Sequence, residues 1–247
     1  MRKAGKLDHG RQAGAGKRRD KIMNILYFKK LDSTNIKAKQ ISNLNTVVVA
    51  EQQLKGKGRF KRKWSSEKGG LYFSITTSFK DQPQFLTFIA ALSVFKSIKK
   101  LYNVKTTIKW PNDIIYKNKK LCGILTENIF GDQRLSIIGI GVNTNNKVPL
   151  ILKNKAASLT DILKKNIDNK RLLSQILKNF DIYLKKDKGD IITEWKKNSF
   201  LGEKVKVRTI DKTFEGTAFN LDKEGFLIIK TKDNHITIKE GDIFLKH

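Results

Sequence analysis

Short apolar runs alternate with amphipathic segments along this chain from residue 25 onward. The runs 46–50 (TVVVA) and 135–142 (LSIIGIGV) are bounded by polar or glycine-containing stretches and predict strands. Phe85, Phe88 and Leu92 recur at three- and four-residue spacing, which predicts an amphipathic helix. The expected strands are 25–28, 46–51, 71–77, 107–110, 113–116, 121–128 and 135–142. The expected helices are one that follows residues 32–35 and ends near residue 41, and those at 84–101, 158–164, 169–185 and 191–198.

The pattern changes after residue 200, where short strands follow one another at close spacing. They are expected at 204–208, 214–220, 226–229 and 235–239. Such spacing is typical of a small β-barrel or SH3-like module. We therefore expect an α+β chain, with a mixed β-sheet and packed helices over residues 23–200 and an SH3-like β-barrel over residues 201–247.

Residues 1–22 are rich in Gly, Ala and Arg and carry almost no apolar side chains. Such a segment cannot bury a core, and we expect it to be a disordered basic tail. It has no apolar stretch of the kind found in a secretory signal. It is also too short and too polar for a helix-turn-helix domain, so we expect no DNA-binding arm and no DNA partner.

The composition suits a soluble globular protein, with 247 residues, 39% hydrophobic and 30% charged. No apolar run approaches the roughly 20 residues that a membrane span needs. The single cysteine, Cys122, lies in the apolar pattern LCGIL and is interpreted as a core thiol. One cysteine excludes an intrachain disulfide and fits a reducing compartment, so we expect a cytoplasmic protein.

The formal net charge of +28 leaves three interpretations open. One is nucleic-acid binding through phosphate contacts. Another is long-range attraction of an acidic protein partner. The third is a compositional bias of the chain toward Lys, Asn and Ile.

The most constraining stretch is the glycine-rich segment 51–64, EQQLKGKGRFKRKW. It follows a predicted buried strand and places six basic residues around Gly56 and Gly58. Glycine tolerates positive φ and lets the backbone approach a ligand closely. Cations beside free backbone N–H groups form an anion cradle. A solvated basic surface loop is the alternative for this segment taken alone.

A second segment favours an anion-binding loop over a solvated surface loop. Residues 109–113 (KWPND) lie between two apolar runs, and Lys119 and Lys120 follow a predicted hairpin turn. Oxygen ligands such as those of Asn112 and Asp113 suit Mg²⁺ bound to a nucleotide. A cationic glycine loop and an Asn-Asp pair together predict a nucleotide site.

Taken in order, the motifs resemble those of biotin–protein ligase, in the form that lacks the N-terminal DNA-binding domain. They are Ser33-Thr34-Asn35, GKGRFKRKW, GGLYFS, KWPND, KKLCGILTE and GIGVN. The combination of the GKGRFKRKW and KWPND motifs is highly specific, and the resemblance runs from about residue 25 to residue 246. It implies the biotin–lipoate ligase catalytic fold, similar to class II synthetases, followed by the SH3-like module.

The resemblance also implies a site for each ligand. The implied catalytic residues are Lys120 and Arg59. The implied biotin contacts are Ser33, Thr34, Asn35, Gln53, Lys57, Gly58, Arg59, Gly70 and Lys120. The implied ATP contacts are Lys57, Arg59, Arg62, Lys63, Trp64, Lys109, Asn112 and Asn143. The implied Mg²⁺ ligands are Asn112 and Asp113. Ser33 and Thr34 also suit helix capping, and both roles can hold.

The implied reaction has two steps. Biotin's carboxylate attacks the α-phosphate of ATP in the presence of Mg²⁺ and forms biotinyl-5′-AMP, which then acylates a lysine of a biotin carboxyl carrier protein. We expect Trp64 to fold over the ligand with a mobile loop. The protein itself would be a monomer or homodimer.

The loop departs from the family pattern at several positions. Lys57 stands where Arg is commoner, Phe60 and Lys61 replace Arg and Gly, and Leu54 replaces a polar residue. Lysine cannot form the bidentate phosphate contact of arginine, so we expect weaker retention of the adenylate.

Two other functions are alternatives for this sequence. A lipoate or octanoate ligase shares the fold, but it would carry a different glycine and histidine motif, and none of His9, His235 and His247 lies in the predicted core. An RNA-binding protein would need exposed aromatic residues among the basic ones, whereas most aromatic residues here follow core periodicity.

Overall fold

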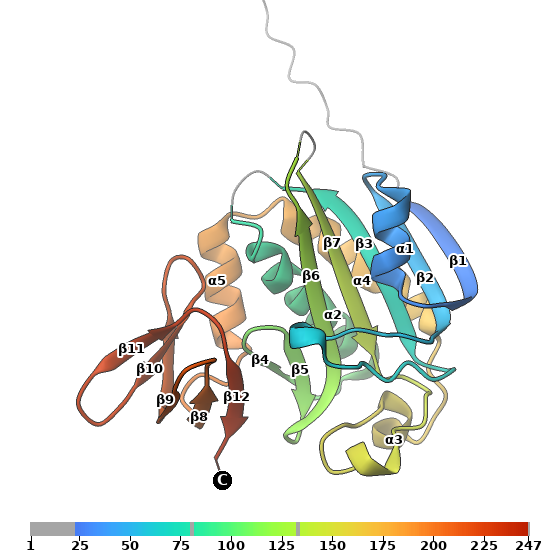
Figure 1. The fold of residues 1–247 in the computed structure, drawn as a ribbon. Helices are drawn as coiled ribbons and strands as arrows, with labels where there is room; N and C mark the ends of the chain where they lie inside the picture. Colours follow the sequence, from blue (N-terminus) through green and yellow to red (C-terminus); the bar gives the residue numbers. More distant parts are fainter. Residues whose placement is uncertain (1–22, 80–81, 132–133, 247) are drawn as a thin grey trace, which may run out of the picture.

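The computed structural model describes residues 23–79, 82–131 and 134–246, and Figure 1 gives its ribbon. Its main sheet has seven strands in the order β1-β2-β3-β7-β6-β5-β4. These strands are β1 (Asn24–Leu31), β2 (Thr46–Gln53), β3 (Leu71–Ser78), β4 (Thr107–Lys109), β5 (Asp113–Tyr116), β6 (Lys119–Ile129) and β7 (Leu135–Val142). β1 and β2 are parallel and the other neighbours are antiparallel, which confirms the mixed sheet.

Helices cover both faces of this sheet. α1 (Thr34–Ile41) lies on one face, while α2 (Phe85–Tyr102), α4 (Asn169–Leu184) and α5 (Lys188–Lys197) lie on the other (Figure 1). The alternation of side chains along β2 explains this layering, because Val48 packs with Ala38 of α1 whereas Val47 and Val49 join the larger core with α2. α2 is buried along most of its length, as the apolar spacing predicted.

The C-terminal β module predicted from strand spacing is confirmed as a second, antiparallel sheet. Its strands are β8 (Lys204–Arg208), β9 (Thr213–Leu221), β10 (Leu227–Lys230), β11 (His235–Ile238) and β12 (Asp242–Leu245), in the order β11-β10-β9-β8-β12. β12 was not predicted. It has three consecutive apolar residues, of which Ile243 is buried and Phe244 is exposed, and this pattern is too short to recognise in sequence.

Three short elements complete the described residues: the 3-10 turns η1 (Arg59–Lys61) and η2 (Leu150–Leu152), and the helix α3 (Leu159–Leu163). The other predicted helices and strands are present, with ends shifted by a few residues. The hairpin turn between β5 and β6 has positive φ at Lys117 and Asn118, as a tight turn requires. The basic tail 1–22 and part of the predicted turn at 131–133 lie outside the described residues.

The C-terminal sheet is anchored to the main one by specific contacts. The Trp110 indole Nε1 donates a hydrogen bond to the carbonyl of Gly225 at 3.0 Å, and Gln84 Nε2, next to the start of α2, donates to the carbonyl of Glu224 at 3.4 Å. No described strand of one sheet pairs with a strand of the other. We therefore propose residues 23–200 and 201–247 as the two domains.

No helix in the described ranges is long and apolar enough to cross a membrane.

The Cys122 thiol lies in the core of the main sheet with no exposed surface. Burial raises its pKa, so the reactive thiolate is scarce at pH 8. We expect native protein to resist iodoacetamide and protein in guanidinium to be alkylated fully, as measured by intact mass. Alkylation of native protein at the rate of a free cysteine would contradict this core assignment.

Candidate active site

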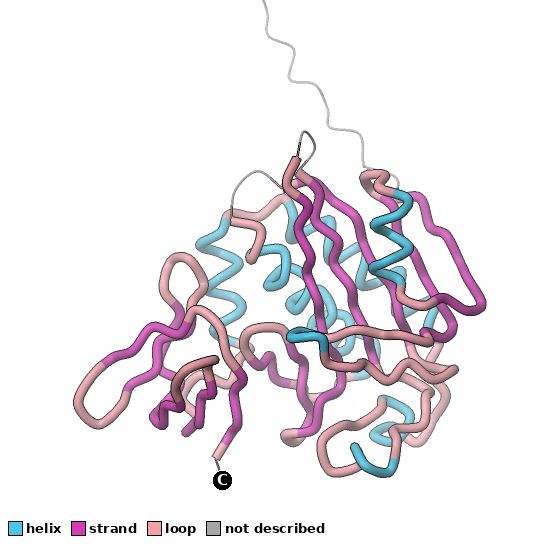
Figure 2. Tube along the Cα trace, in the orientation of Figure 1, coloured by secondary structure: helices cyan, strands magenta, loops and turns pink. Residues whose placement is uncertain are grey.

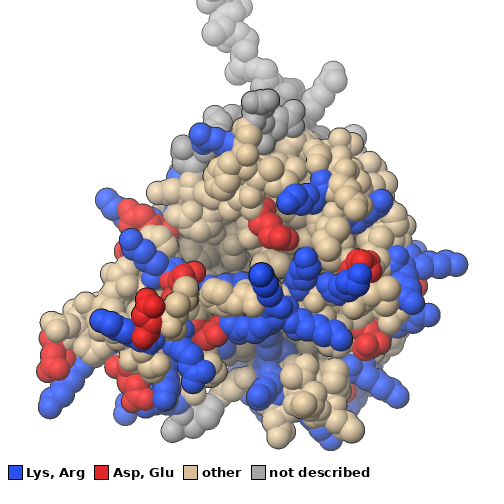
Figure 3. Space-filling view, in the orientation of Figure 1, with Lys and Arg blue, Asp and Glu red and all other residues tan. Residues whose placement is uncertain are grey.

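A cavity of about 260 Å³ opens on the face of the main sheet that the glycine-rich loop crosses. Figure 2 shows this loop passing in front of β6 and β7. The cavity wall combines the start of α1, the loop, the β5–β6 hairpin, β7, the segment 146–156 and the first residue of β12. Figure 3 shows basic side chains gathered across this face.

The loop folds back on itself. Lys57 and Lys63 form an antiparallel bridge, and the Gly58 N–H donates to the Arg62 carbonyl at 2.7 Å. The positive φ values expected at the glycines occur instead at Phe60 and Lys61, at 53° and 58°. Gly56 is needed for close packing, because a Cβ there would lie 2.5 Å from the Trp64 carbonyl oxygen.

Phe60 has a structural role at its unusual position. Its ring lies 4.8 Å from the Arg59 guanidinium and 5.3 Å from that of Arg62. Cation–π contacts at such distances stabilise both arginines in the turn.

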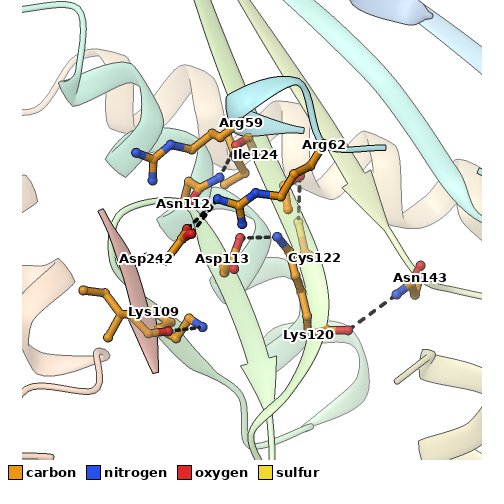
Figure 4. Close-up of polar contacts among 12 residues, drawn as sticks. Arg59, Arg62, Lys109, Asn112, Asp113, Lys120, Cys122, Ile124, Asn143 and Asp242 are labelled. Atoms are coloured by element: carbon orange, nitrogen blue, oxygen red, sulfur yellow. Dashed lines mark hydrogen bonds and ion pairs between the residues drawn. The ribbon is translucent and has the colours of Figure 1, made fainter. Parts of the chain in front are cut away.

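The loop and the hairpin face the same cavity, as predicted. Arg59 and Arg62 approach from the loop, and Lys120 approaches from β6 (Figure 4). The Lys120 ammonium forms an ion pair with Asp113 Oδ1 at 2.6 Å. Asn112 donates from Nδ2 to the Ile124 carbonyl at 2.6 Å. The cavity therefore holds cations from segments about sixty residues apart in sequence, from Arg59 to Lys120.

Burial affects the charge of this cluster. It lowers the pKa of the Arg59 guanidinium, while Asp242, Asp113 and Glu240 oppose that shift. It also lowers the pKa of the Lys109 ammonium. Arginine stays protonated at neutral pH, so the half-buried Arg59 keeps its positive charge in the site.

Asp242 is a site residue that the sequence analysis missed. It begins the unpredicted strand β12, and its carboxylate accepts hydrogen bonds from Arg62 Nη2 at 2.6 and 2.8 Å. Nearby, Arg59 Nη1 donates to the Gly241 carbonyl at 3.5 Å and Lys109 Nζ donates to the Ile243 carbonyl at 3.1 Å. The C-terminal module therefore holds three basic groups of the catalytic domain.

The opposite end of the cavity is polar and uncharged. Gln53 Oε1 accepts from the Thr34 N–H at 2.8 Å and from its hydroxyl at 3.1 Å. Gln53 Nε2 donates to the Ser66 hydroxyl at 2.8 Å. The Ser74 hydroxyl lies 2.7 Å from Thr34 Oγ1 and 2.6 Å from Asn35 Oδ1. Ser66 and Ser74 were not predicted, because isolated serines in a loop and a strand carry no sequence signal.

The hydrogen bonds of two predicted residues here differ from what the sequence indicated. Asn35 Nδ2 donates to Glu127 Oε2 at 2.6 Å, which fixes the amide against β6. Ser33 occupies the N-cap position of α1, but its side chain makes no capping hydrogen bond. Its hydroxyl is thus available to the cavity that it lines.

Trp64 lies against a glycine floor formed by Gly123 of β6 and Gly141 of β7. A Cβ on Gly141 would come within 2.4 Å of the indole Nε1, and one on Gly123 within 2.9 Å of the ring. Lys120 Nζ lies 5.2 Å from the ring centroid. The Nε1 group is buried and has no hydrogen-bond partner among the described residues.

The predicted site residues occupy three places. The cavity wall includes Ser33, Thr34, Asn35, Gln53, Lys57, Gly58, Arg59, Arg62, Lys63, Trp64, Asn112, Asp113, Lys120 and Asn143. Lys109 lines an adjoining cavity that shares Arg59, Arg62, Asn112 and Asp242 with the first. Gly70 is buried and is not part of the cavity wall, and a Cβ there would overlap the Tyr72 side chain.

Among the described residues, no group of three or more His, Cys, Asp or Glu side chains could hold a metal ion. Asn112 keeps its Oδ1 available, and Asp113 and Asp242 line the same cavity. This donor set fits Mg²⁺ that takes most of its ligands from phosphates and water.

The Arg62–Asp242 contact is expected to restrain the loop. A partly exposed ion pair contributes about 0.5–1 kcal/mol, so Asp242→Asn should speed tryptic cleavage within residues 57–63 about two- to fivefold. Peptide mass analysis over time measures the rate. Glu215→Gln is the matched control, because Glu215 pairs with Lys206 and Lys246 in the same module. Equal cleavage of the two variants would contradict the restraint.

Gly141→Ala is expected to displace Trp64 from the sheet. The added methyl group requires the indole to move toward solvent, which should shift its fluorescence emission to longer wavelength. Subtracting the spectrum of a Trp64→Phe variant isolates this residue. Gly189→Ala is the control, since nothing lies within 4 Å of its added Cβ. An unchanged Trp64 spectrum in Gly141→Ala would refute the packing.

Comparisons with known proteins agree with this geometry. The model of the biotin/lipoate A/B protein ligase family matches residues 24–145, and the biotin protein ligase C-terminal domain matches residues 200–246. The bifunctional ligase/repressor BirA of Bacillus subtilis is 33% identical over 99% of this chain and 81% of its own length. The biotin–[acetyl-CoA-carboxylase] ligase of Mycobacterium tuberculosis is 27% identical over 80% of this chain and 77% of its own.

A solved structure extends the comparison to three dimensions. The biotin protein ligase of Aquifex aeolicus in complex with biotin and ATP has a TM-score of 0.81 and 31% identity, and the match covers 91% of this chain and 99% of that one. The sequence match to a full-length relative and the structural match span both sheets. This chain belongs to the biotin protein ligase family.

Proposed function

We propose that this protein activates biotin with ATP as biotinyl-5′-AMP and transfers the biotinyl group to a lysine of a biotin carboxyl carrier protein. The observation that carries the proposal is the meeting of the loop and hairpin cations in one cavity whose other end is polar and uncharged. One end suits phosphates and a carboxylate, and the other suits a ligand with both donors and acceptors.

In the first step, a carboxylate oxygen of biotin bonds to the α-phosphorus of ATP and the bond to pyrophosphate breaks. Both reactants are anionic, so the reaction needs positive charge held in place before they meet. Arg59 supplies it from the loop and Lys120 from β6. Asp113 orients the Lys120 ammonium through their 2.6 Å ion pair.

In the second step, the lysine amine of the carrier attacks the acyl carbon and AMP leaves with the bonding electrons. The amine loses a proton to solvent. Lys120 and Arg59 stabilise the charge on the departing phosphate, and no side chain of the enzyme needs to form a covalent bond.

The uncharged end of the cavity is the proposed site of the biotin ring system. A ureido group has two N–H donors and one carbonyl acceptor, which Thr34, Gln53 and Ser33 can match through hydroxyl and amide groups. Asn35, Lys57 and Gly58 complete this proposed contact set. Gly70 acts through packing against Tyr72, since it lies outside the cavity wall.

The proposed nucleotide contacts lie at the basic end. Arg62, Lys63 and Lys57 come from the loop, and Lys109 extends the positive charge into the adjoining cavity. Asn112 and Asn143 add amide groups, and Trp64 shields the reactive anhydride from water. Asn112 Oδ1 and Asp113 would hold Mg²⁺, which neutralises phosphate charge when bound.

The acid that is activated distinguishes the proposed biotin ligase from a lipoate ligase. The dithiolane ring of lipoate has no N–H or carbonyl group, so it would leave the polar groups near Thr34 and Gln53 without partners. Incubating the full chain with ATP, Mg²⁺ and either acid, followed by mass spectrometry, tests the choice. Biotinyl-AMP with biotin and little lipoyl-AMP is the expected result, and the reverse would overturn the proposal.

Lys120→Ala is expected to slow adenylate formation by about 10²–10³, because one preorganised charge in a shielded site contributes on that scale. Biotin-dependent exchange of pyrophosphate into ATP measures the first step alone. Lys117→Asn is the matched control. It removes a positive charge from the same hairpin at a position with φ of 44°, which asparagine tolerates. Near-normal exchange by Lys120→Ala would show that the site is misplaced.

A further inference from the structure

The rim of the cavity carries an exposed apolar pair that the two chemical steps do not use. Leu150 and Ile151 are each 86% exposed, the highest values among the large exposed apolar residues of the described chain. They lie in η2, in the segment 146–156 near α3 (Figure 1). Val148, Pro149 and Leu152 of the same segment line the cavity, whereas Leu150 and Ile151 do not.

This segment is ordered by hydrogen bonds to the hairpin that carries Lys120. The Lys120 N–H donates to the Lys155 carbonyl at 2.8 Å, and the Ala157 N–H donates to the Lys120 carbonyl at 3.0 Å. Within the turn, the Leu152 N–H donates to the Pro149 carbonyl at 2.8 Å. The apolar pair is therefore presented outward on a defined backbone, directly linked to the proposed catalytic lysine.

The surroundings of the pair are basic. Lys147 and Lys153 flank it and are exposed, and no Asp or Glu occurs between residues 147 and 160. On the glycine-rich loop, which forms another part of the wall, Lys61 and Lys63 are also exposed. A partner that contacts Leu150 and Ile151 thus meets positive charge on several sides, which favours acidic side chains around its own apolar contact.

We propose that Leu150, Ile151, Lys147 and Lys153 form the docking surface for the acceptor protein, a folded carrier domain with acidic residues around its target lysine. The inference rests on the proposed function, because the second step requires that lysine to enter the cavity past its rim. Val148, Pro149 and Leu152 line the cavity itself, so the outward pair is left for a macromolecule.

Large apolar side chains that remain in water are a common feature of sites that bind another protein. Charge around such a contact mainly raises the association rate and selects the partner, and its effect weakens as salt increases. Substitutions in the docking surface should therefore impair only the transfer to the acceptor protein. The effect of changing its charges should depend on the salt concentration.

The test compares transfer to a purified apo biotin carboxyl carrier domain with transfer to hydroxylamine, a small nucleophile that needs no docking. For the full chain carrying Leu150→Ser and Ile151→Ser, KM for the carrier domain should rise about tenfold. Pyrophosphate exchange and hydroxylamine trapping should stay within about twofold of wild type. Ile210→Ser, at a residue 77% exposed on the C-terminal module, is the matched control and should leave all three unchanged.

Charge reversal provides a second, independent measurement. Lys147→Glu with Lys153→Glu should raise KM for the carrier domain at low salt, and the difference from wild type should shrink as salt increases. Neither side chain lines the cavity, so the first step should be unaffected.

Other outcomes would overturn the proposal. Parallel loss of pyrophosphate exchange in the serine variant would mean that the pair covers the nucleotide. A change in sedimentation with an unchanged KM for the carrier would mean that it contacts a second copy of the chain. Absence of exchange in the wild-type protein would instead refute the proposed function itself.

Discussion

Mutual repulsion among closely placed cations is the constraint on which this structure depends. Arg59, Arg62, Lys109 and Lys120 lie around two adjoining cavities. Arg62 is exposed, but Arg59, Lys109 and Lys120 are half-buried, and the lower local dielectric constant strengthens the repulsion among these three. Each group has a partner that offsets this cost: Asp242 for Arg62, Asp113 for Lys120 and backbone carbonyls for Arg59 and Lys109. These partners therefore stabilise the cluster in the folded protein before an anionic substrate binds.

This constraint explains why a small C-terminal module accompanies the main sheet. Its last strand supplies Asp242 and the Ile243 carbonyl that accepts from Lys109, and Gly241, just before that strand, supplies the carbonyl that accepts from Arg59. The hydrogen bond from Trp110 to Gly225 holds the module next to the segment that carries Asn112 and Asp113. The module thus contributes to the charge balance of the site, in addition to apolar residues that join the core of the main sheet.

Most elements of the fold could be predicted, because each has a long apolar pattern of one period. β5 and β7 have the predicted ends, and α2 differs by one residue. β12 could not be predicted from three apolar residues, and Asp242 was missed with it. The convergence of Arg59 with Lys120 followed from family motifs. Ser74 and Glu127 required the register of the strands, which places residues 39 and 92 positions apart within hydrogen-bond distance, and Ser66 required the path of the loop. The packing role of Gly56 could not be predicted either, since close contact with Trp64 leaves no pattern in the sequence.

The most direct measurement is a crystal structure of the full chain with a hydrolysis-resistant analogue of biotinyl-5′-AMP. We expect the phosphoryl group or its replacement to contact both Arg59 and Lys120, and the ureido ring to contact Thr34 and Gln53. An analogue bound outside this cavity, or one whose phosphoryl group meets the loop but not the hairpin, would contradict the account.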